Sequence, residues 1–456
     1  MKILTILGVL ISITLAFLVF ILEPYLTFSL LLVFCLLLLT FINIENSLLI
    51  ITLLRASLDV FRDVSRISFG SISLNITGSF SLLIICLGII YFLLNKNKIT
   101  FFRLLLPLFI FLVICALSIF YSPHKVGSLQ ELVRLSSYFI LAWLIADVFN
   151  TKQKIQRFMG YFIGALVIPL TVSFWQHFAN AGSLHNGYNR LVGTLRHPSS
   201  YGKFLVLYLI IFLVFLIFRT QGNKIKNLSL VSIGVLFFQI VYTYSRSVWI
   251  QSFIGVFVLC VLTRKKALIF ILVGLIVVFS TTPLLKNRFK QEISNSSDSF
   301  DIFNSEKLSG SNKSRFEFNE FALKEMFFKS PLFGKGIGSF YYYYSPRKYG
   351  VSFETHGDLT KLLGEVGLLG TLTFYYGMLN LIKYFHRAKI ICKDPFCLKI
   401  IISFLCLLYI QLFAYFFDAN IRLVITQWYF WSFCGLAMAC SKIGGSNEID
   451  LKYNKN

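Results

Sequence analysis

The run YGKFLVLYLIIFLVFLIF, residues 201–218, contains a single charged side chain, that of Lys203. An α-helix needs about 20 mostly apolar residues to cross the hydrocarbon core of a membrane, which is about 30 Å thick. The apolar residues follow one another without the alternation that a barrel strand requires. The run therefore predicts a membrane-spanning helix.

Comparable runs recur along nearly the whole chain of 456 residues, of which 57% are hydrophobic and 14% charged. With a mean hydropathy of +0.75, the chain has too little polar surface to cover a set of soluble domains. We expect an all-α, polytopic integral membrane protein with about 12–14 transmembrane helices. The expected spans lie near 3–22, 25–44, 76–94, 101–120, 129–149, 158–178, 201–218, 228–245, 247–262, 267–282, 359–382, 399–417 and 421–439. A further segment, 46–61, is weakened as a span by Arg55 and Asp59.

Short basic loops orient the bundle, because loops rich in Lys and Arg stay in the cytoplasm. They occupy 151–157, 219–226, 263–266 and 383–399. Four outer segments follow from this assignment: 179–200, the corner 245–247, the long loop 283–358 and the link 418–421. If 46–61 crosses the membrane, both termini are cytoplasmic. No cleavage site of small residues follows the first span, which is therefore expected to be retained. The predicted units are an N-terminal bundle (1–282), the exported loop (283–358), C-terminal transmembrane helices (359–440) and a cytoplasmic tail (441–456).

The formal net charge of +23 is large. Nucleic acid is one possible partner for so basic a chain, but much of the charge lies in cytoplasmic loops that touch anionic lipid headgroups, so membrane lipids are the expected partner. More informative are arginines at the outer ends of helices. Each alone is able to extend to the headgroups, but together they suit a multiply charged anion, because guanidinium groups bind phosphate oxygens bidentately. They are Arg134, Arg190, Arg196, Arg246 and Arg422, with Arg315 in the exported loop.

Cysteines and carboxylates predict neither a metal nor another cofactor. None of the nine cysteines lies in the exported loop, so no disulfide framework is expected. Cys392 and Cys397 lack the second ligand pair of a zinc site. No cluster of carboxylates on the outer face resembles a magnesium site.

The exported loop contains the pattern S-x-x-E at Ser314 and Glu317, which predicts that a helix begins there. The apolar face of this helix indicates that it lies on the membrane or caps the bundle. The three glycines that follow predict a turn, because the Lys-Ser/Thr of a phosphate loop is missing: Gly334, Gly336 and Gly338. The run YYYY, 341–344, is either an interfacial aromatic girdle or a platform for sugar rings.

The stretch THGDLTKLLGEVGLLG, 355–370, enters the next predicted span from the outer side. His356 is either an ordinary residue at a helix start or a general base for a hydroxyl that attacks near a phosphate, since an imidazole titrates near neutral pH. Asp358, Lys361 and Glu365 have the helical spacing that allows mutual pairing. A stripe of small residues predicts close packing of another helix: Gly364, Gly367 and Gly370.

The segment HGDLTKLLGEVGLLG closely resembles the signature of the O-antigen ligase and polymerase family. Three further stretches resemble the family in the expected order, and the similarity covers most of residues 120–380. Gly357 and Leu359 stand where the family commonly has Asn and Tyr. The further stretches are NRLVGTLRHPSSYGKFL (189–205), YTYSRSVWI (242–250) and SRFEFNEFALKEMFFKSPLFGKGIGSF (314–340).

The resemblance implies a multi-pass glycosyltransferase of the bacterial inner membrane, with its active site on the periplasmic face. Because no cluster of carboxylates on the outer face resembles a magnesium site, we expect it to need no metal. The implied donor is a glycan on a polyprenyl diphosphate such as undecaprenyl diphosphate. The acceptor is lipid A-core for an O-antigen ligase, the reading we favour, or a growing glycan for a polymerase. His356 would activate the acceptor, with Asp358 as reserve base. The implied diphosphate-binding residues are Arg190, Arg246, Arg134 and Arg315. We add Arg196 because it is one of the arginines at the outer ends of helices.

A polysaccharide or lipid transporter is the alternative from another functional class. A transporter would be expected to carry charges near the middle of the bilayer and matched, broken helices in two halves. Here the charges cluster at helix ends, and no repeat between the halves is evident. The pattern therefore favours an enzyme.

Overall fold

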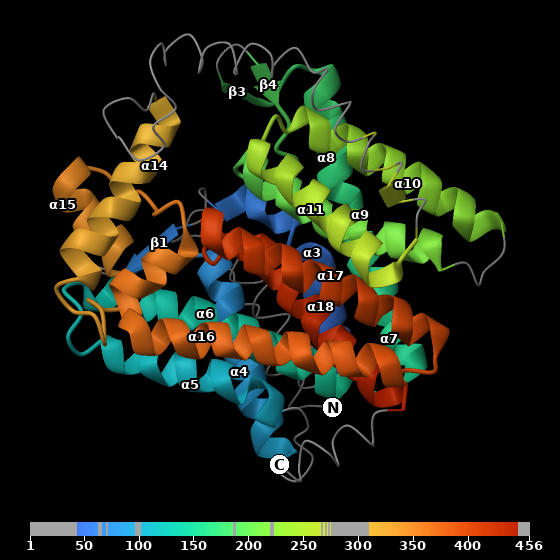
Figure 1. Cartoon of the computed structure of the whole chain (residues 1–456), viewed down its shortest axis with the longest axis horizontal. Helices are drawn as coiled ribbons and strands as arrows, with labels where there is room; N and C mark the ends of the chain where they lie inside the picture. The colour runs from blue at the N-terminus through green and yellow to red at the C-terminus, as the bar shows by residue number, and fades with distance from the viewer. Residues whose placement is uncertain are drawn as a thin grey trace, which may run out of the picture.

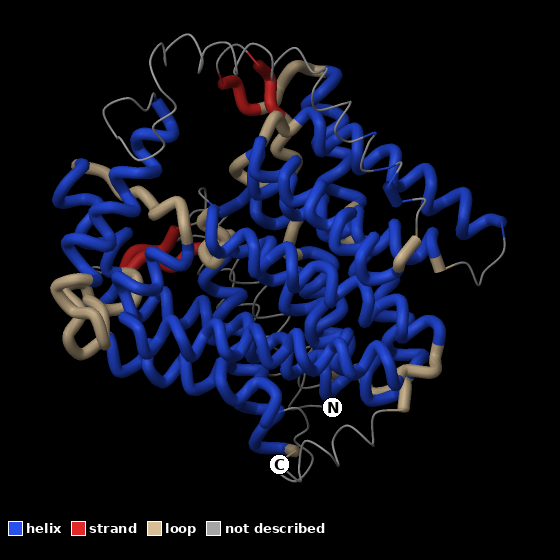
Figure 2. Tube along the Cα trace, viewed as in Figure 1, coloured by secondary structure: helices blue, strands red, loops and turns tan. Residues whose placement is uncertain are grey.

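We describe a computed structural model of the chain. It describes residues 43–62, 66–69, 72–95, 102–185, 188–218, 223–265, 268–269, 271, 274 and 310–445. The predicted spans 3–22 and almost all of 25–44 and 267–282 lie outside these residues, as does the predicted tail from 446 onward. The described chain is a bundle of helices with two short hairpins (Figures 1 and 2). The prediction of an all-α, polytopic membrane protein is confirmed.

The N-terminal half supplies most of the bundle. Its helices are α3 (Ile44–Leu54), the 3₁₀ turn η1 (Ser57–Arg62), α4 (Ile76–Leu94), α5 (Phe102–Ser118), α6 (Lys125–Val148), α7 (Lys152–Gly164), α8 (Val167–Phe178), α9 (Pro198–Ile217), α10 (Asn223–Tyr242) and α11 (Arg246–Thr263). The hairpins pair β1 (Arg66–Phe69) with β2 (Ile72–Asn75), and β3 (Ser183–His185) with β4 (Tyr188–Arg190), both antiparallel. At 1.5 Å per residue, α3 is about 16 Å long and too short to cross a bilayer alone.

The predicted span 158–178 is not one continuous helix. The chain forms α7 and α8, which are separated at Ala165 and Leu166. Pro169 lies in the first turn of α8, where its missing N–H and fixed φ favour the start of a new helix. The two helices together still form one apolar segment, Lys152–Phe178, that is long enough to cross a membrane.

The C-terminal half consists of α16 (Asp358–Ile391), α17 (Pro395–Phe417) and α18 (Val424–Ile443). Every residue of α18 from Val424 to Ser441 is buried, and the helix packs against α6, α9 and α17. A helix that is buried on all sides belongs to the interior of the bundle. In the described part of the chain, five helical segments are long and apolar enough to cross a membrane, including α9, α11, α16 and α17.

The segment before α16 forms a small helical layer over one end of the bundle. It contains α14 (Gly310–Phe321), the π-helical turn η4 (Ala322–Phe327), a second such turn η5 (Phe340–Tyr344) and α15 (Ser345–Tyr349). The predicted helix start at Ser314 is wrong, because α14 begins at Gly310 and Ser314 lies inside it. Ser and Glu are both tolerated within helices, so their spacing alone does not fix an N-terminus.

The glycine turn after η4 docks onto a break in α16. Gly367 has φ 63° and ψ −166°, which interrupts the helix. The freed carbonyls of Gly364 and Glu365 accept hydrogen bonds from the backbone N–H groups of Lys335 (2.9 Å) and Gly336 (2.7 Å). The predicted turn is confirmed by the positive φ values of its three glycines. Of the predicted glycine stripe, Gly364 contacts η4, whereas Gly367 meets the turn and not a helix.

Candidate active site

His356 lies in the extended link that leads into α16. Its ring stacks on Phe318 of α14, with the ring centroids 6.1 Å apart and an angle of 13° between the planes. The next residue, Gly357, packs so closely on the end of α17 that a Cβ would lie 3.1 Å from the Phe416 carbonyl oxygen. The helical layer and the C-terminal end of α17 therefore hold the imidazole between them.

The pKa of His356 is lowered to about 4, mainly by burial and then by the positive charges of Arg315 and Lys203. Asp418 and Glu354 act in the opposite direction. The imidazole is consequently neutral near pH 7, which is the form that accepts a proton. A second consequence is that anion binding to the neighbouring cations would raise this pKa.

Arg315 lies on α14, three residues before Phe318, so one helical face carries both groups toward His356. Its Nε atom is buried and has no hydrogen-bond partner within the described residues. A buried guanidinium N–H without a bound oxygen is a candidate donor to an anion.

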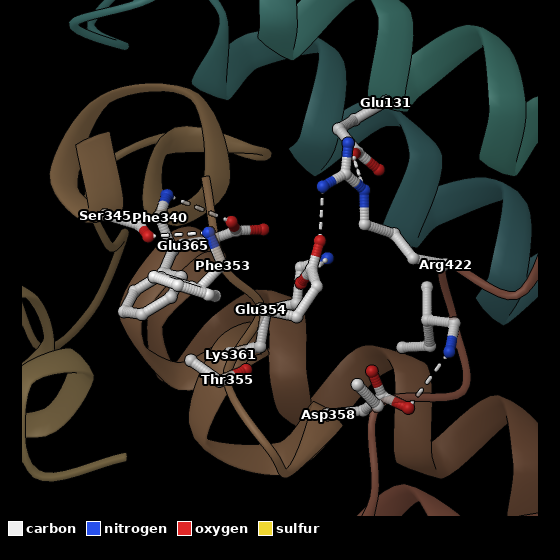
Figure 3. Close-up of polar contacts among 12 residues, drawn as sticks. Glu131, Phe340, Ser345, Phe353, Glu354, Thr355, Asp358, Lys361, Glu365 and Arg422 are labelled. Carbon is white, nitrogen blue, oxygen red and sulfur yellow. Dashed lines mark hydrogen bonds and ion pairs between the residues drawn. The ribbon is translucent and has the colours of Figure 1, made fainter. Parts of the chain in front are cut away.

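Asp358 is engaged by the backbone of the link between α17 and α18. Its Oδ2 atom accepts hydrogen bonds from the N–H groups of Asn420 at 2.6 Å and Ile421 at 3.0 Å (Figure 3). The carboxylate is 1% exposed. In this arrangement Asp358 fixes the link beside His356, and its role as a reserve base stays a prediction.

Arg422 is the centre of a second charged group (Figure 3). It forms an ion pair with Glu131 through Nε at 2.6 Å and another with Glu354 through Nη1, and it donates from Nη2 to the Tyr342 hydroxyl at 2.9 Å. The guanidinium also lies over the Tyr341 ring. Two of the four tyrosines in the run 341–344 thus bind an arginine of this network.

Glu354 joins this network to α16, because its Oε2 atom pairs with Lys361 at 3.2 Å. The charge of Lys361 acts on both Asp358 and Glu365, as their spacing allows, but its ion pair is with Glu354. Glu365 accepts from the backbone N–H of Phe340. Although burial raises the pKa of Glu354, the charges of Arg422 and Lys361 lower it to about 2.

Arg134 pairs with Glu131, three residues earlier on α6. Arg422 and Glu354 both act on it electrostatically, which places Arg134 in the same network. Its guanidinium is therefore already engaged by carboxylates in this structure.

The remaining predicted arginines lie where β4 meets the corner between α10 and α11. Arg190 donates from Nε to the carbonyl oxygen of Thr243 at 2.9 Å, and Arg246 is the first residue of α11. Arg196 is exposed just before α9. The hydroxyl oxygens of Ser199 in α9 and Ser247 in α11 are 3.4 Å apart. Figure 1 shows β4 at the top of the bundle and α14 at the upper left of the bundle.

The structure thus gathers Arg315, Asp358 and His356 around the link between α17 and α18, with the Arg134 network beside them. Arg190, Arg196 and Arg246 form a separate corner, and their approach to His356 stays a prediction. Lys203, one turn after Ser199 on α9, extends from that corner toward the link. Among the described residues, no three His, Cys, Asp or Glu side chains gather as potential metal ligands.

Comparison with known families decides what kind of domain surrounds His356. Residues 231–375, from α10 into α16, match the O-antigen ligase family. This part of the chain, about a third of its length, is therefore similar to an O-antigen ligase family domain. A comparison with curated proteins found no match. The match confirms the resemblance stated from the motifs and indicates a glycan-transferring enzyme in a multi-pass membrane protein.

The matched range contains Arg246, Arg315 and His356, but other charged groups near His356 lie outside it. Sequence reasoning did not select three of the groups that act on His356: Lys203, Glu354 and Asp418. Lys203 was visible as the lone charge in an apolar run, and a charge within such a run is by default a functional candidate. Glu354 and Asp418 carried no comparable signal, because both lie in short links whose path depends on tertiary packing.

Proposed function

We propose that the protein transfers a glycan from a polyprenyl diphosphate to an acceptor hydroxyl at the periplasmic face of the bacterial inner membrane. We further propose that it is an O-antigen ligase whose acceptor is lipid A-core. The observation that carries the proposal is a neutral imidazole, His356, held beside the unpaired Nε of Arg315. Both lie within the range that matches the O-antigen ligase family.

In the proposed reaction, the acceptor hydroxyl gives its proton to His356 as its oxygen forms a bond to C1 of the donor sugar. The bond between C1 and the diphosphate oxygen breaks, and its electron pair leaves on the polyprenyl diphosphate. A general base of this kind contributes about 10²- to 10⁴-fold to the rate. His356 suits this step because burial and Arg315 keep it unprotonated.

The departing diphosphate gains negative charge, and cations already in position stabilise that charge without reorganisation. Arg315 is the first candidate, because its charge acts on the imidazole of His356. We assign the same role to Arg190, Arg246 and Arg196, whose corner adjoins the start of α9. Arg134, engaged with Glu131, would contribute through its charge. We propose that these cations make a metal unnecessary.

The test uses purified protein in lipid nanodiscs with a polyprenyl-diphosphate-linked glycan and a lipid A-core acceptor. Wild-type protein should form a new glycosidic bond, and His356→Ala should lose at least about 100-fold of the rate. The control is His386→Gln at the other end of α16, where the ring bonds to Tyr409. Bond formation at the wild-type rate by His356→Ala would refute the catalytic assignment. Transport of the donor without a new bond would support the transporter.

A polymerase would use the same chemistry on a growing glycan, and a gel of lipopolysaccharide from a deletion strain separates the two. Loss of a ligase leaves bare core, with the polymer stranded on its carrier. Loss of a polymerase leaves core that carries one repeat unit. We expect bare core.

A further inference from the structure

Lys203 is a buried cation in the second turn of α9, with its side chain 2% exposed. Its ammonium lies 2.8 Å from Asp418 Oδ2 and 2.5 Å from Asn420 Oδ1. A buried charge requires such partners, because desolvation strongly disfavours an isolated one. These contacts join α9 to the link between α17 and α18.

The same link contacts the segment that carries His356. Asp358 binds the backbone of Asn420 and Ile421, and Gly357 packs on the Phe416 carbonyl. Asp418 therefore lies between α9 and the imidazole. Its charge favours protonated His356, whereas that of Lys203 disfavours it.

Four charged groups act on the imidazole, each from an element packed around it: Arg315 from α14, Lys203 from α9, Asp418 from the link and Glu354 from the segment preceding His356. Glu354 is held by both Arg422 and Lys361. Asp418, by contrast, pairs with Lys203 and accepts one backbone N–H, that of Ala419. Asp418 is thus held by a single ion pair, to Lys203, although the charge of Arg315 also acts on it.

We propose that Asp418 is a positioning residue that stabilises the protonated form of His356 during transfer, and that Lys203 exchanges Asp418 for a phosphate oxygen when the donor binds. This inference rests on the proposed function. The acceptor proton moves to His356, Asp418 stays ionised and faces the new imidazolium, and the diphosphate leaves with the electron pair of its bond to C1. Binding of the polyprenyl diphosphate donor would thereby raise the basicity of His356, so His356 is a strong base only when the leaving group is in place.

A titration of His356 by NMR, with His356→Ala to assign its signal, separates this role from a structural one. Asp418→Asn keeps the shape but removes the charge, so the pKa of His356 should fall. Lys203→Met removes the opposing positive charge, so the pKa of His356 should rise. Each of the two changes should be about one unit. The control is Lys152→Met, which removes a Lys–Asp pair with Asp394 elsewhere in the bundle and should leave His356 unchanged. Shifts in the same direction, or no shift, would overturn the proposal.

The exchange itself is tested with a polyprenyl diphosphate that carries no sugar. This probe should raise the pKa of His356 in the wild type, and Lys203→Met should bind it about tenfold more weakly. Equal binding by wild type and Lys203→Met would exclude the exchange. Because this readout needs no turnover, it decides the inference even if no glycosidic bond is formed and the proposed function fails.

In the transfer assay, Asp418→Asn should lower kcat about tenfold with little change in the KM of the donor, whereas Lys203→Met should raise that KM. The acidic limb of the kcat profile should move to lower pH in Asp418→Asn. Asp418→Glu should restore most of the rate, and it keeps the test decisive if the Asn variant folds poorly. Wild-type kcat and pH profile in Asp418→Asn would overturn the positioning role.

Discussion

Lys335 donates its backbone N–H to the carbonyl oxygen of Gly364 at 2.9 Å, which fastens the small helical layer to the helix that follows His356. The neighbouring carbonyls of Pro331 and Leu332 accept in return from Leu368 and Leu369 of α16. This reciprocal docking fixes the layer that carries Arg315 relative to α16. It requires the break in α16 at Gly367.

The first prediction concerns Gly367→Ala. A Cβ at Gly367 would lie 2.4 Å from the Leu332 backbone, and its φ of 63° disfavours any L side chain. We expect a loss of roughly 2 kcal/mol of stability and a larger fractional loss of activity, because the layer moves away from His356. Thermal unfolding in nanodiscs and the transfer assay measure both. Gly160→Ala on α7, where a Cβ meets nothing within 4 Å, should be neutral, and equal effects of the two variants would contradict this account.

Glu354→Gln should destabilise the protein by roughly 3 kcal/mol, because Arg422 and Lys361 then lose their shared counter-charge in a buried site. The folded-state pKa of Glu354 is about 2, below its ordinary value of 4.5. Its stabilisation is therefore complete above about pH 4.5 and is lost as the pH falls toward 2. Unfolding followed from pH 7 to pH 3 should show this dependence in the wild type and less of it in the variant. The control is Glu320→Gln, which breaks an exposed pair with Lys324 and should cost less than about 1 kcal/mol.

The sequence predicted the membrane class, and the predicted spans that fall on described residues are helical, because the length and composition of an apolar run can be read from the sequence itself. The division of 158–178 into α7 and α8 was less evident, although Pro169 offered a local signal. The pairing of charges in the site was not predictable from spacing. Lys361 has helical neighbours of opposite charge, yet it pairs with Glu354, while the backbone of the distant link engages Asp358.

The pH dependence of transfer tests His356 directly. Its pKa of about 4, lowered by burial and then by Arg315, means that the free enzyme holds a neutral base down to mildly acidic pH. The kcat/KM value should be independent of this group above about pH 5 and should fall as the pH drops through about 4. A limb near pH 6.5 in kcat/KM would indicate a solvated, unperturbed imidazole and contradict the packed arrangement against Phe318.

Removal of divalent metals should leave transfer unchanged, because the proposed stabilisation of the leaving diphosphate comes from arginines and Lys203. The measurement is the initial rate of glycan transfer after dialysis against EDTA, with and without added Mg²⁺. The donor must be freed of metal in the same way, since diphosphates bind Mg²⁺ themselves. A rate that collapses with EDTA and returns with Mg²⁺ would show that the cations of the site are insufficient.

Arg246→Lys tests whether the corner of β4, α9 and α11 belongs to the same donor site as His356. Arg246 begins α11 and Arg264 follows its last turn, so the two arginines mark opposite ends of one helix. A lysine keeps the charge at position 246 but loses the bidentate fork that grips phosphate oxygens. We expect about tenfold weaker binding of a sugar-free polyprenyl diphosphate to Arg246→Lys and no change for Arg264→Lys. Because the probe is the leaving group of the proposed reaction, unchanged binding in both variants would remove the corner from the donor site and leave Arg315 and Lys203 as its cations.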